Sequence, residues 1–344
     1  MWWAAMSNHT ETLRASLLRD NPPTGVMTWT AEEYFASGAL GGSGFGPAMQ
    51  SGRHWLQDQQ RERSESPAMR FGTAGHCALL EPAEWGKRYA PAFDVGKTPA
   101  EAVIYESGKD VGERLKALKS EGHAVKVSGS NAEKMTALQA VEPHACYLSD
   151  LVSDHARENS GRILLSADDE ARCTNAVHAV LEWHERWTAA GNVPVLGGRT
   201  EQRLAWVDEG TGLYCRAAVD IVSPCQSAWG DLKFTHDAGP AFDRHAKNYN
   251  YPEQGAHYLD GYRAISGQDV TPRWFWLVVE AEPPHGVRLV WASADVLARA
   301  RRRRRIAMER ILEVLIDPSA PVYPVEADTM ELTAWERREE DNNE

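Results

Sequence analysis

Residues 214–235 read Tyr-Cys-Arg-Ala-Ala-Val-Asp-Ile-Val-Ser-Pro-Cys-Gln-Ser-Ala-Trp-Gly-Asp-Leu-Lys-Phe-Thr, and this stretch decides the fold class. The run 214–222 is rich in apolar and β-branched residues and predicts a strand, which Ser223-Pro224 ends. A short third strand is predicted at 229–234. The preceding segment 201–207 is also strand-like, and the turn residues 208–212 join it to 214–222 as a hairpin.

The two later strands of this stretch carry Asp220, Asp231 and Lys233. Side chains alternate across a strand, so Asp231 and Lys233 point to the same face. Carboxylates are ligands that Mg²⁺ prefers, and a bound metal polarises a phosphoryl oxygen and activates water. A lysine beside the metal can neutralise charge in the transition state. The alternative is an ordinary exposed strand, because so short a motif also occurs by chance.

The wider sequence predicts an α/β fold in which a mixed central sheet is flanked by helices. We expect a flexible N-terminal arm at 1–27, a single domain at 28–324 and an acidic, solvated, partly disordered tail at 325–344. Within the domain, 28–198 is helical, its part from 90 to 160 being an insertion or cover, and 199–324 is the catalytic core. Further elements are predicted at 30–39, 47–61, 66–80, 111–119, 131–141, 168–189, 251–265, 273–281, 287–291 and 294–315.

Five groups of residues, in this order, resemble the PD-(D/E)XK nucleases, and in particular the RecE-type exonucleases (exodeoxyribonuclease VIII) of phages and prophages. They are Phe71-Gly-Thr-Ala-Gly-His76 with the helix that follows it, Glu201, Arg216-Ala-Ala-Val-Asp220, Gly230-Asp-Leu-Lys233 and Tyr251-Pro-Glu-Gln254 with Tyr258. The resemblance covers most of 28–335 and is weak from 90 to 160.

The resemblance implies a role for each matched residue. His76, Asp220 and Asp231 would be metal ligands, with the carbonyl of Leu232; Lys233 would be the catalytic lysine; Glu201 would support a second metal or its water; Gln254 and Tyr258 would contact the DNA backbone.

Each of these residues also has a plainer interpretation. His76 lies alone on an apolar helix and would more often be a satisfied core histidine. Glu201 could pair with Arg203 or Arg216. Gln254 could cap the helix or fill space in the packing, and Tyr258 could belong to the core. Their i, i+4 spacing nevertheless places both on one helix face.

The run Arg299-Ala-Arg-Arg-Arg-Arg-Arg305 is the strongest basic feature of the chain. Arg301, Arg303 and Arg304 are candidates for phosphate contacts or for an anionic subunit interface. The alternative is a solvated helix face, partly paired with Glu309 and Glu313.

The composition sets limits on this interpretation. The net charge of −12 argues against a nucleic-acid binder, but carboxylates of a metal site count as negative until the metal neutralises them. Five cysteines without a C-x-x-C pair argue against a zinc site, an iron–sulfur cluster or a disulfide framework and fit a reducing cytoplasm, that of a bacterial host cell. The sequence has no apolar run of the ~18 residues that a membrane span needs.

The function that we expect is a Mg²⁺-dependent exonuclease acting on double-stranded DNA ends, with Mn²⁺ as a substitute. The resemblance implies 5′→3′ polarity, 3′ single-stranded overhangs for phage-type recombination, a ring-shaped homo-oligomer and a RecT-type annealing protein as partner. The alternatives are an endonuclease or single-strand nuclease of the same fold, and a non-catalytic DNA-binding or assembly protein with a decayed site.

Overall fold

The computed structural model describes residues 2–61, 64–319, 321–323, 326–327, 329–332 and 334–341. The chain divides into two compact units. Unit 1 comprises 1–65, 182–280 and 286–344, and unit 2 comprises 66–181 with 281–285. The division does not follow the boundary predicted at residue 198, because the helix Ala167–Ala189 passes from unit 2 into unit 1.

Unit 1 is built on a six-stranded sheet with the order β1-β6-β7-β8-β9-β10. The strands are β1 (Gly25–Met27), β6 (Arg199–Val207), β7 (Tyr214–Val222), β8 (Ala228–Thr235), β9 (Arg273–Glu280) and β10 (Val287–Trp291). Strands β8 and β9 run parallel and all other neighbours run antiparallel, so the predicted mixed sheet is confirmed. The parallel pair requires a crossover, which the helices α11 (Ala241–Asn248) and α12 (Tyr251–Ser266) provide.

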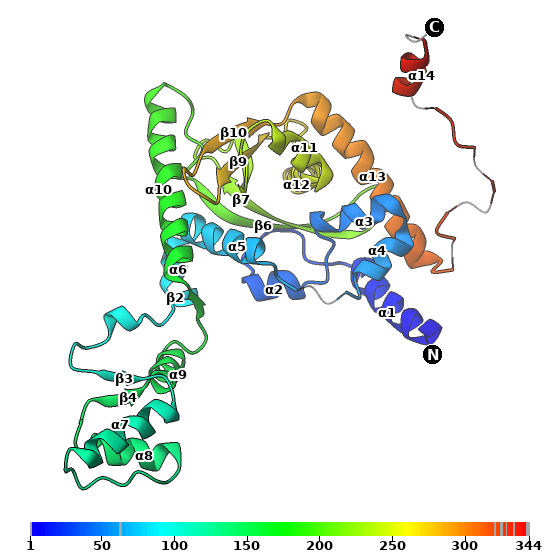
Figure 1. Ribbon diagram of the computed structural model, residues 1–344. Helices are drawn as coiled ribbons and strands as arrows, with labels where there is room; N and C mark the ends of the chain where they lie inside the picture. Colours follow the sequence, from blue (N-terminus) through cyan, green and yellow to red (C-terminus); the bar gives the residue numbers. More distant parts are fainter. Residues whose placement is uncertain are drawn as a thin grey trace. The chain divides into compact units, whose positions relative to one another are not determined.

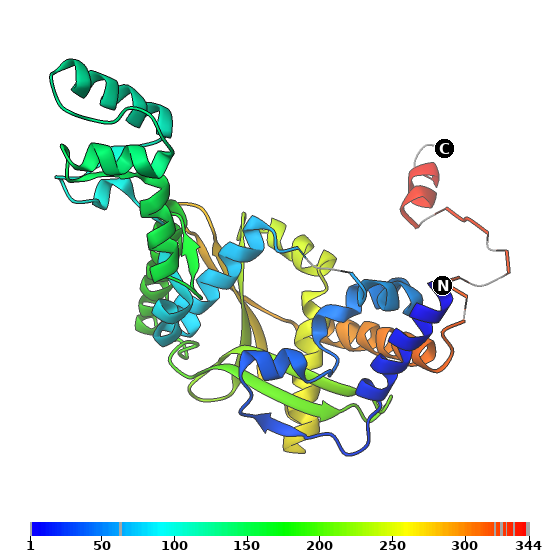
Figure 2. The same ribbon diagram turned by 90° about the horizontal axis from the view of Figure 1, so that it is seen from below.

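Helix α12 lies against strands β6 and β7, and α13 (Ala294–Ile316) packs on α12 (Figures 1 and 2). Two glycines of α12 permit the close approach to the sheet. A Cβ added at Gly255 would lie 2.6 Å from the Trp274 ring, and one at Gly261 would lie 2.6 Å from the Trp206 ring. The core of unit 1 therefore forms between the sheet and the face of α12 that has the smallest side chains.

The N-terminal segment differs from the prediction of a flexible arm. It forms helix α1 (Trp2–Leu17), and β1 pairs with β6. Leu17 is only 2% exposed and belongs to the core of unit 1, with Leu13 and Leu18 packed against it. Apolar periodicity is weak in this segment, so the sequence did not predict a helix. Packing of α1 against α13 stabilises it.

The helices that precede the core lie mostly where they were predicted. Thr30 caps α2 (Ala31–Ala36) with the expected capping box. The helix predicted at 47–61 is instead two helices, α3 (Phe45–Gln50) and α4 (Gly52–Asp58). They are separated by Ser51, which is extended and whose hydroxyl accepts from the His54 N–H. The short η1 (Gly42–Gly44) stands before α3.

Unit 2 is a separate assembly of helices and short strands. Its elements are α5 (Pro67–Leu80), α6 (Pro82–Arg88), β2 (Tyr89–Pro91), η2 (Val95–Lys97), β3 (Val103–Tyr105), α7 (Gly108–Ser120), α8 (Asn131–Gln139), β4 (Ala145–Tyr147), α9 (Leu148–Glu158), β5 (Ile163–Leu165) and the start of α10 (Ala167–Ala189). Strands β2 and β5 pair in parallel, as do β3 and β4. Val111, Leu115 and Leu138 form a small core where α7 meets α8. The segment 90–160 thus has a core of its own.

The C-terminal tail includes a helix, α14 (Ala334–Asp341), where a partly disordered end was predicted. The final residues 342–344 lie outside the described residues. Among the helices of the described residues, none combines the length and the apolar character that a membrane span requires.

Candidate active site

Three carboxylates stand in one row across β6, β7 and β8. The β6–β7 register pairs Thr200 with Ile221 and Gln202 with Val219, which sets Glu201 opposite Asp220. The β7–β8 register pairs Ile221 with Gly230, and its next step would set Asp220 opposite Asp231, where the regular pairing stops. The row therefore lies where the β6–β7 pairing is interrupted at one residue and the β7–β8 pairing ends.

The side chain of Asp220 takes part in the link between the diverging strands. Its Oδ2 accepts a hydrogen bond of 2.8 Å from the main-chain N–H of Leu232 on β8. Asp231 is 2% exposed and Asp220 is 8% exposed, and the ammonium of Lys233 pairs with Asp231. The structure thus brings together the three residues that the sequence placed at the centre of the site, and Asp231 and Lys233 share a face as predicted.

The local charges shift the pKa values of this cluster. Burial, followed by the charge of Asp231, raises the pKa of the Asp220 carboxyl well above its usual range, although Lys233 and the Leu232 N–H act in the opposite direction. Burial opposes the charged form of Lys233, but Asp231 and Asp220 outweigh it and raise the pKa of that amine. The lysine therefore stays an ammonium, while the Asp220 carboxyl holds its proton to a higher pH than an exposed aspartate does.

Glu201 lies on the row in an unusual backbone conformation. Its φ is +51°, in the left-handed region that non-glycine residues rarely adopt. A carboxylate oxygen of Glu201 lies within 4.8 Å of one of Asp220. The guanidiniums of Arg203 and Arg216, its two alternative partners, bond to the carbonyls of Trp29 and Tyr34.

Two other predicted ligands are not decided by this geometry. His76 lies on α5, in unit 2, and is half-buried. The carbonyl of Leu232 belongs to β8, between Asp231 and Lys233. Both remain predictions as metal ligands.

Helix α12 presents one face to this cluster. The Tyr251 ring centroid lies 4.7 Å from Lys233 Nζ, in a cation–π contact. Gln254 Nε2 donates to Tyr258 Oη at 2.9 Å. Sequence reasoning missed Tyr251, although its spacing of three and seven residues from the other two is the signal for a shared helix face.

The predicted DNA contact of Tyr258 needs correction. Its side chain is only 6% exposed and packs edge-on against Trp274, with ring centroids 5.6 Å apart. Its hydroxyl is engaged by Gln254, which is half-buried. Tyr258 is therefore a core residue that orients Gln254, and Gln254 alone remains a candidate DNA contact on this pair.

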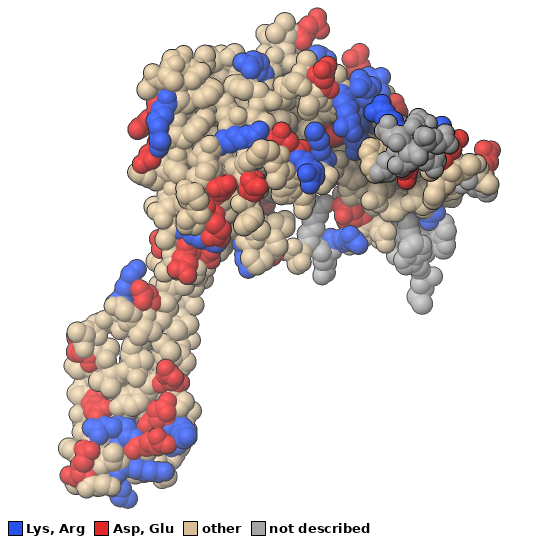
Figure 3. Space-filling model, turned by 45° about the horizontal axis from the view of Figure 1, so that its top comes forward, with Lys and Arg blue, Asp and Glu red and all other residues tan. Residues whose placement is uncertain are grey.

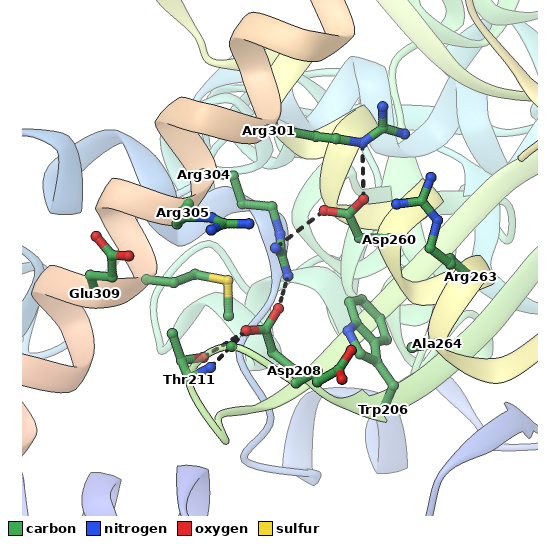
Figure 4. Close-up of a pocket in the computed structure, with 13 residues that line it drawn as sticks. Trp206, Asp208, Thr211, Asp260, Arg263, Ala264, Arg301, Arg304, Arg305 and Glu309 are labelled. Carbon is green, nitrogen blue, oxygen red and sulfur yellow. Dashed lines mark hydrogen bonds and ion pairs between the residues drawn. The ribbon is translucent and has the colours of Figure 1, made fainter. Parts of the chain in front are cut away.

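The predicted phosphate contact of Arg304 also needs correction. Arg304 is 6% exposed, and its guanidinium reaches between Asp208 (2.8 Å) and Asp260 (3.2 Å) (Figure 4). Its Nε donates to Nδ1 of His257 at 3.0 Å. The helix position of Arg304 faces α12 and the turn after β6, so neither the DNA contact nor the solvated-face interpretation applies to it.

The other arginines of the run divide by helix face. Arg301 pairs with Asp260 at 3.0 Å and Arg303 pairs with Glu253, each about one-third exposed. Arg299, Arg302 and Arg305 are exposed. Figure 3 shows acidic and basic side chains interspersed on the face in view. The exposed face of α13 thus remains a candidate contact surface, whereas its inner face is committed to α12.

Comparison with known proteins identifies the class to which this fold and site belong. Residues 43–333 match the family described as "PDDEXK-like domain of unknown function (DUF3799)", and the chain belongs to that family. The predicted PD-(D/E)XK fold class is thereby confirmed. No curated protein is significantly similar to the chain.

Two solved structures are similar at low identity. A "putative exonuclease" from Eubacterium rectale is 14% identical, with 91% of this chain and 93% of that chain covered and a TM-score of 0.46. The protein SSO0001 is 12% identical, with 72% and 85% covered and a TM-score of 0.24. Likeness at this level carries no statement about function.

Proposed function

We propose that this protein is a metal-dependent nuclease that hydrolyses phosphodiester bonds of DNA. The observation that carries the proposal is the row of the buried Asp220 and Asp231 with the half-buried Glu201, and Lys233 paired to Asp231. A fold can serve many functions, so the proposal rests on this site and not on the family alone. Membership of a PDDEXK-like family supports the same class of enzyme.

The donor set fits a divalent cation such as Mg²⁺. Hard cations prefer oxygen ligands, and two of the three carboxylates of the row are almost fully buried. Burial and, after it, the charge of Asp231 raise the pKa of Asp220, and a cation bound there would favour the charged carboxylate. Asp220 and Asp231 would hold the metal, with His76 and the Leu232 carbonyl as further proposed ligands and Glu201 beside a second metal or its water. A bound metal would supply Lewis-acid polarisation of the phosphoryl oxygen and an activated water.

The protein's own groups would then act as follows. The Lys233 ammonium, fixed between Asp231 and the Tyr251 ring, would stabilise the negative charge that develops on the phosphate. Gln254, oriented by the Tyr258 hydroxyl, would hold the strand by a phosphate oxygen. Burial of the site lowers the local dielectric, so each of these charges acts more strongly than in water.

The finer proposal is a double-strand exonuclease. The sequence resemblance to RecE-type exonucleases supports 5′→3′ polarity, 3′ overhangs, Mg²⁺ with Mn²⁺ as a substitute, a ring-shaped homo-oligomer, a RecT-type partner and a bacterial cytoplasm as the site of action. With these features, the protein would process DNA ends in phage-type recombination.

A digest separates the levels of this proposal. End-labelled linear duplex, covalently closed circular duplex and single strands are incubated with Mg²⁺, Mn²⁺, Ca²⁺ or EDTA. We expect cleavage of linear duplex with Mg²⁺ or Mn²⁺, and binding without cleavage in Ca²⁺. In EDTA we expect no cleavage. Cleavage of closed circles would contradict the exonuclease proposal and support an endonuclease. Full activity in EDTA would refute the metal mechanism.

A further inference from the structure

Aromatic rings extend from the catalytic lysine to the protein surface. Tyr251, under Lys233 Nζ, lies 6.0 Å from Tyr249 between ring centroids, with the planes inclined by 34°. The Tyr249 ring in turn meets His245 edge-on, with centroids 4.5 Å apart. This series of rings belongs to α11, the start of α12 and the turn between them.

Tyr249 differs from its neighbours because its side chain is exposed. It is 64% exposed, whereas Tyr251 is half-buried and Phe242, on the preceding helix, is 1% exposed. Exposed aromatic faces of this kind are the platforms on which proteins stack unpaired bases, because every base has a π face.

A polar hollow adjoins the same turn. It has a volume of about 420 Å³, within the ~300–1,000 Å³ of ligand pockets. Its lining includes the side-chain amides that flank Tyr249 in sequence, Asn248 and Asn250, and two from α3 and α4, Gln50 and Gln57. An amide offers a donor and an acceptor together, which is the combination that base edges present.

The backbone of the turn is specialised to place these groups. Asn250 has a φ of +57°, a left-handed conformation that Asn adopts more readily than most residues. A Cβ on Gly46 would lie 3.0 Å from Asn250 Nδ2, so the absence of a side chain at Gly46 leaves room for that amide. Arg303 Nη2 donates to Asn250 Oδ1 at 3.5 Å and supports it from α13.

We propose that Tyr249 and this hollow form a binding site for an unpaired nucleotide of the DNA, next to the phosphate that is cut. The proposal rests on the proposed nuclease function and names the form of its substrate: a DNA end whose terminal bases are separated. A base inside an intact duplex has both faces stacked and its pairing edge occupied, and could use neither Tyr249 nor the amides. Lys233 and Tyr249 both contact Tyr251, which would set the stacked base beside the reacting phosphate.

Binding measurements test the site without relying on catalysis. Fluorescence anisotropy in Ca²⁺ is measured for three labelled probes: a blunt duplex, a duplex with a short unpaired end, and the same duplex with abasic residues in that end. For the parent protein we expect the unpaired end to bind more tightly than the other two. Tyr249→Leu should weaken binding of the unpaired end roughly 5- to 100-fold and leave the blunt duplex unchanged.

Conservative variants and a spectroscopic signal separate stacking from a structural role. Tyr249→Phe and Tyr249→Trp should retain parent affinity, and 2-aminopurine in the unpaired end should be quenched by the parent but not by Tyr249→Leu. Equal affinity for abasic and intact ends, or parent affinity in Tyr249→Leu, would overturn the site. If the parent cleaves DNA in Mg²⁺ while these results are obtained, only this inference fails. A parent protein that neither binds nor cleaves DNA would refute both proposals.

Discussion

Two buried ionic clusters of unit 1 show how the same residue types serve different ends. Around Asp220, three carboxylates face one lysine, and the pKa of Asp220 is raised well above its usual range. Around Arg304, all three guanidinium nitrogens have partners in Asp208, Asp260 and His257. There the pKa of Asp208 is lowered: burial opposes this, but Arg304 and the hydrogen bonds from Thr211 outweigh it.

The first cluster matches the proposed metal site, whereas the second links elements of the fold. With Arg301 also paired to Asp260, the cluster around Arg304 has two guanidiniums for two carboxylates, and this balanced cluster fixes α12, α13 and the turn after β6 against one another. An unbalanced cluster stores repulsion that an added cation can relieve. Substitutions in each cluster test whether the two clusters differ in this way.

The largest expected effect is on stability at the balanced cluster. Arg304→Ala would remove the cation that lies between the half-buried Asp208 and Asp260, while Asp260 keeps Arg301 as a partner. The loss should therefore lie near the lower end of the about 3–5 kcal/mol that breaking a buried ion pair typically costs. Urea unfolding followed by circular dichroism measures the change. Arg302→Ala, an exposed position of the same helix, is the matched control and should stay within about 0.5 kcal/mol of the parent. Equal stability of the two variants would contradict the structural role assigned to Arg304.

The next effect is on the rate at the unbalanced cluster. Lys233→Ala should reduce cleavage ~10²–10³-fold and leave DNA binding nearly unchanged, because the ammonium acts mainly on charge that develops in the transition state. Asp220→Ala is its counterpart and should lose activity by losing metal, so raised Mg²⁺ or Mn²⁺ partly restores it. A nuclease assay across a metal titration, with a gel shift in Ca²⁺, separates the two. Parent-like cleavage by Lys233→Ala would mean that Asp231 and Lys233 belong to an ordinary strand.

A smaller effect concerns pH at the balanced cluster. His257 is fully buried; its Nδ1 accepts from Arg304, and its Nε2 donates to the Arg216 carbonyl. Burial and the charge of Arg304 lower its pKa well below 6.5. The unfolded chain therefore binds a proton that the folded chain does not. Stability from this residue is present above about pH 6.5 and is lost as pH falls below it, by up to about 1.4 kcal/mol per pH unit.

His257→Gln provides the control for that prediction, since an amide can make both hydrogen bonds without titrating. Urea unfolding between pH 5 and 8 should show a shallower acid decline for the variant. An unchanged slope would show that His257 does not contribute to the acid sensitivity.

The smallest effect is expected at two partly exposed arginines of α13 that pair with α12. Arg301 and Arg303 are partly exposed, and replacing both with Ala should weaken DNA binding if they reach phosphates. The slope of log affinity against log salt would then fall by roughly 0.9 for each phosphate that is no longer neutralised. Arg302→Ala, on the exposed face of the same helix, shows whether that face contributes to the salt dependence instead. An unchanged slope would assign Arg301 and Arg303 only to their pairs with Asp260 and Glu253, and a fall in molecular mass by light scattering would assign them to a subunit interface.

The sequence predicted the centre of the site because its geometry is local. Asp231 and Lys233 share a face by strand alternation, and the β6–β7 hairpin follows from its turn residues. The helix cap at Thr30 and the proline at the start of α12 are likewise short-range signals. These features depend on residues only a few positions apart, so no knowledge of packing is needed.

The row of carboxylates could not be predicted in the same way. It depends on the register of β7 with two neighbours and on the loss of regular pairing at Asp220, which tertiary packing sets. The burial of Tyr258 and Arg304 also depends on how α12 and α13 pack. A run of five arginines looks identical at each position until the opposing aspartates are known.

The backbone of Glu201 has a consequence for how this family can change. A left-handed residue with a Cβ costs of order 1 kcal/mol, and Gly would adopt the same φ without that cost. Selection for stability alone would thus favour Glu201→Gly, and selection for the proposed role of the Glu201 carboxylate beside a metal would oppose it. At position 201 the stability of the fold and the proposed nuclease activity therefore favour different residues. A variant selected for thermal stability that acquires Gly here would be expected to lose turnover.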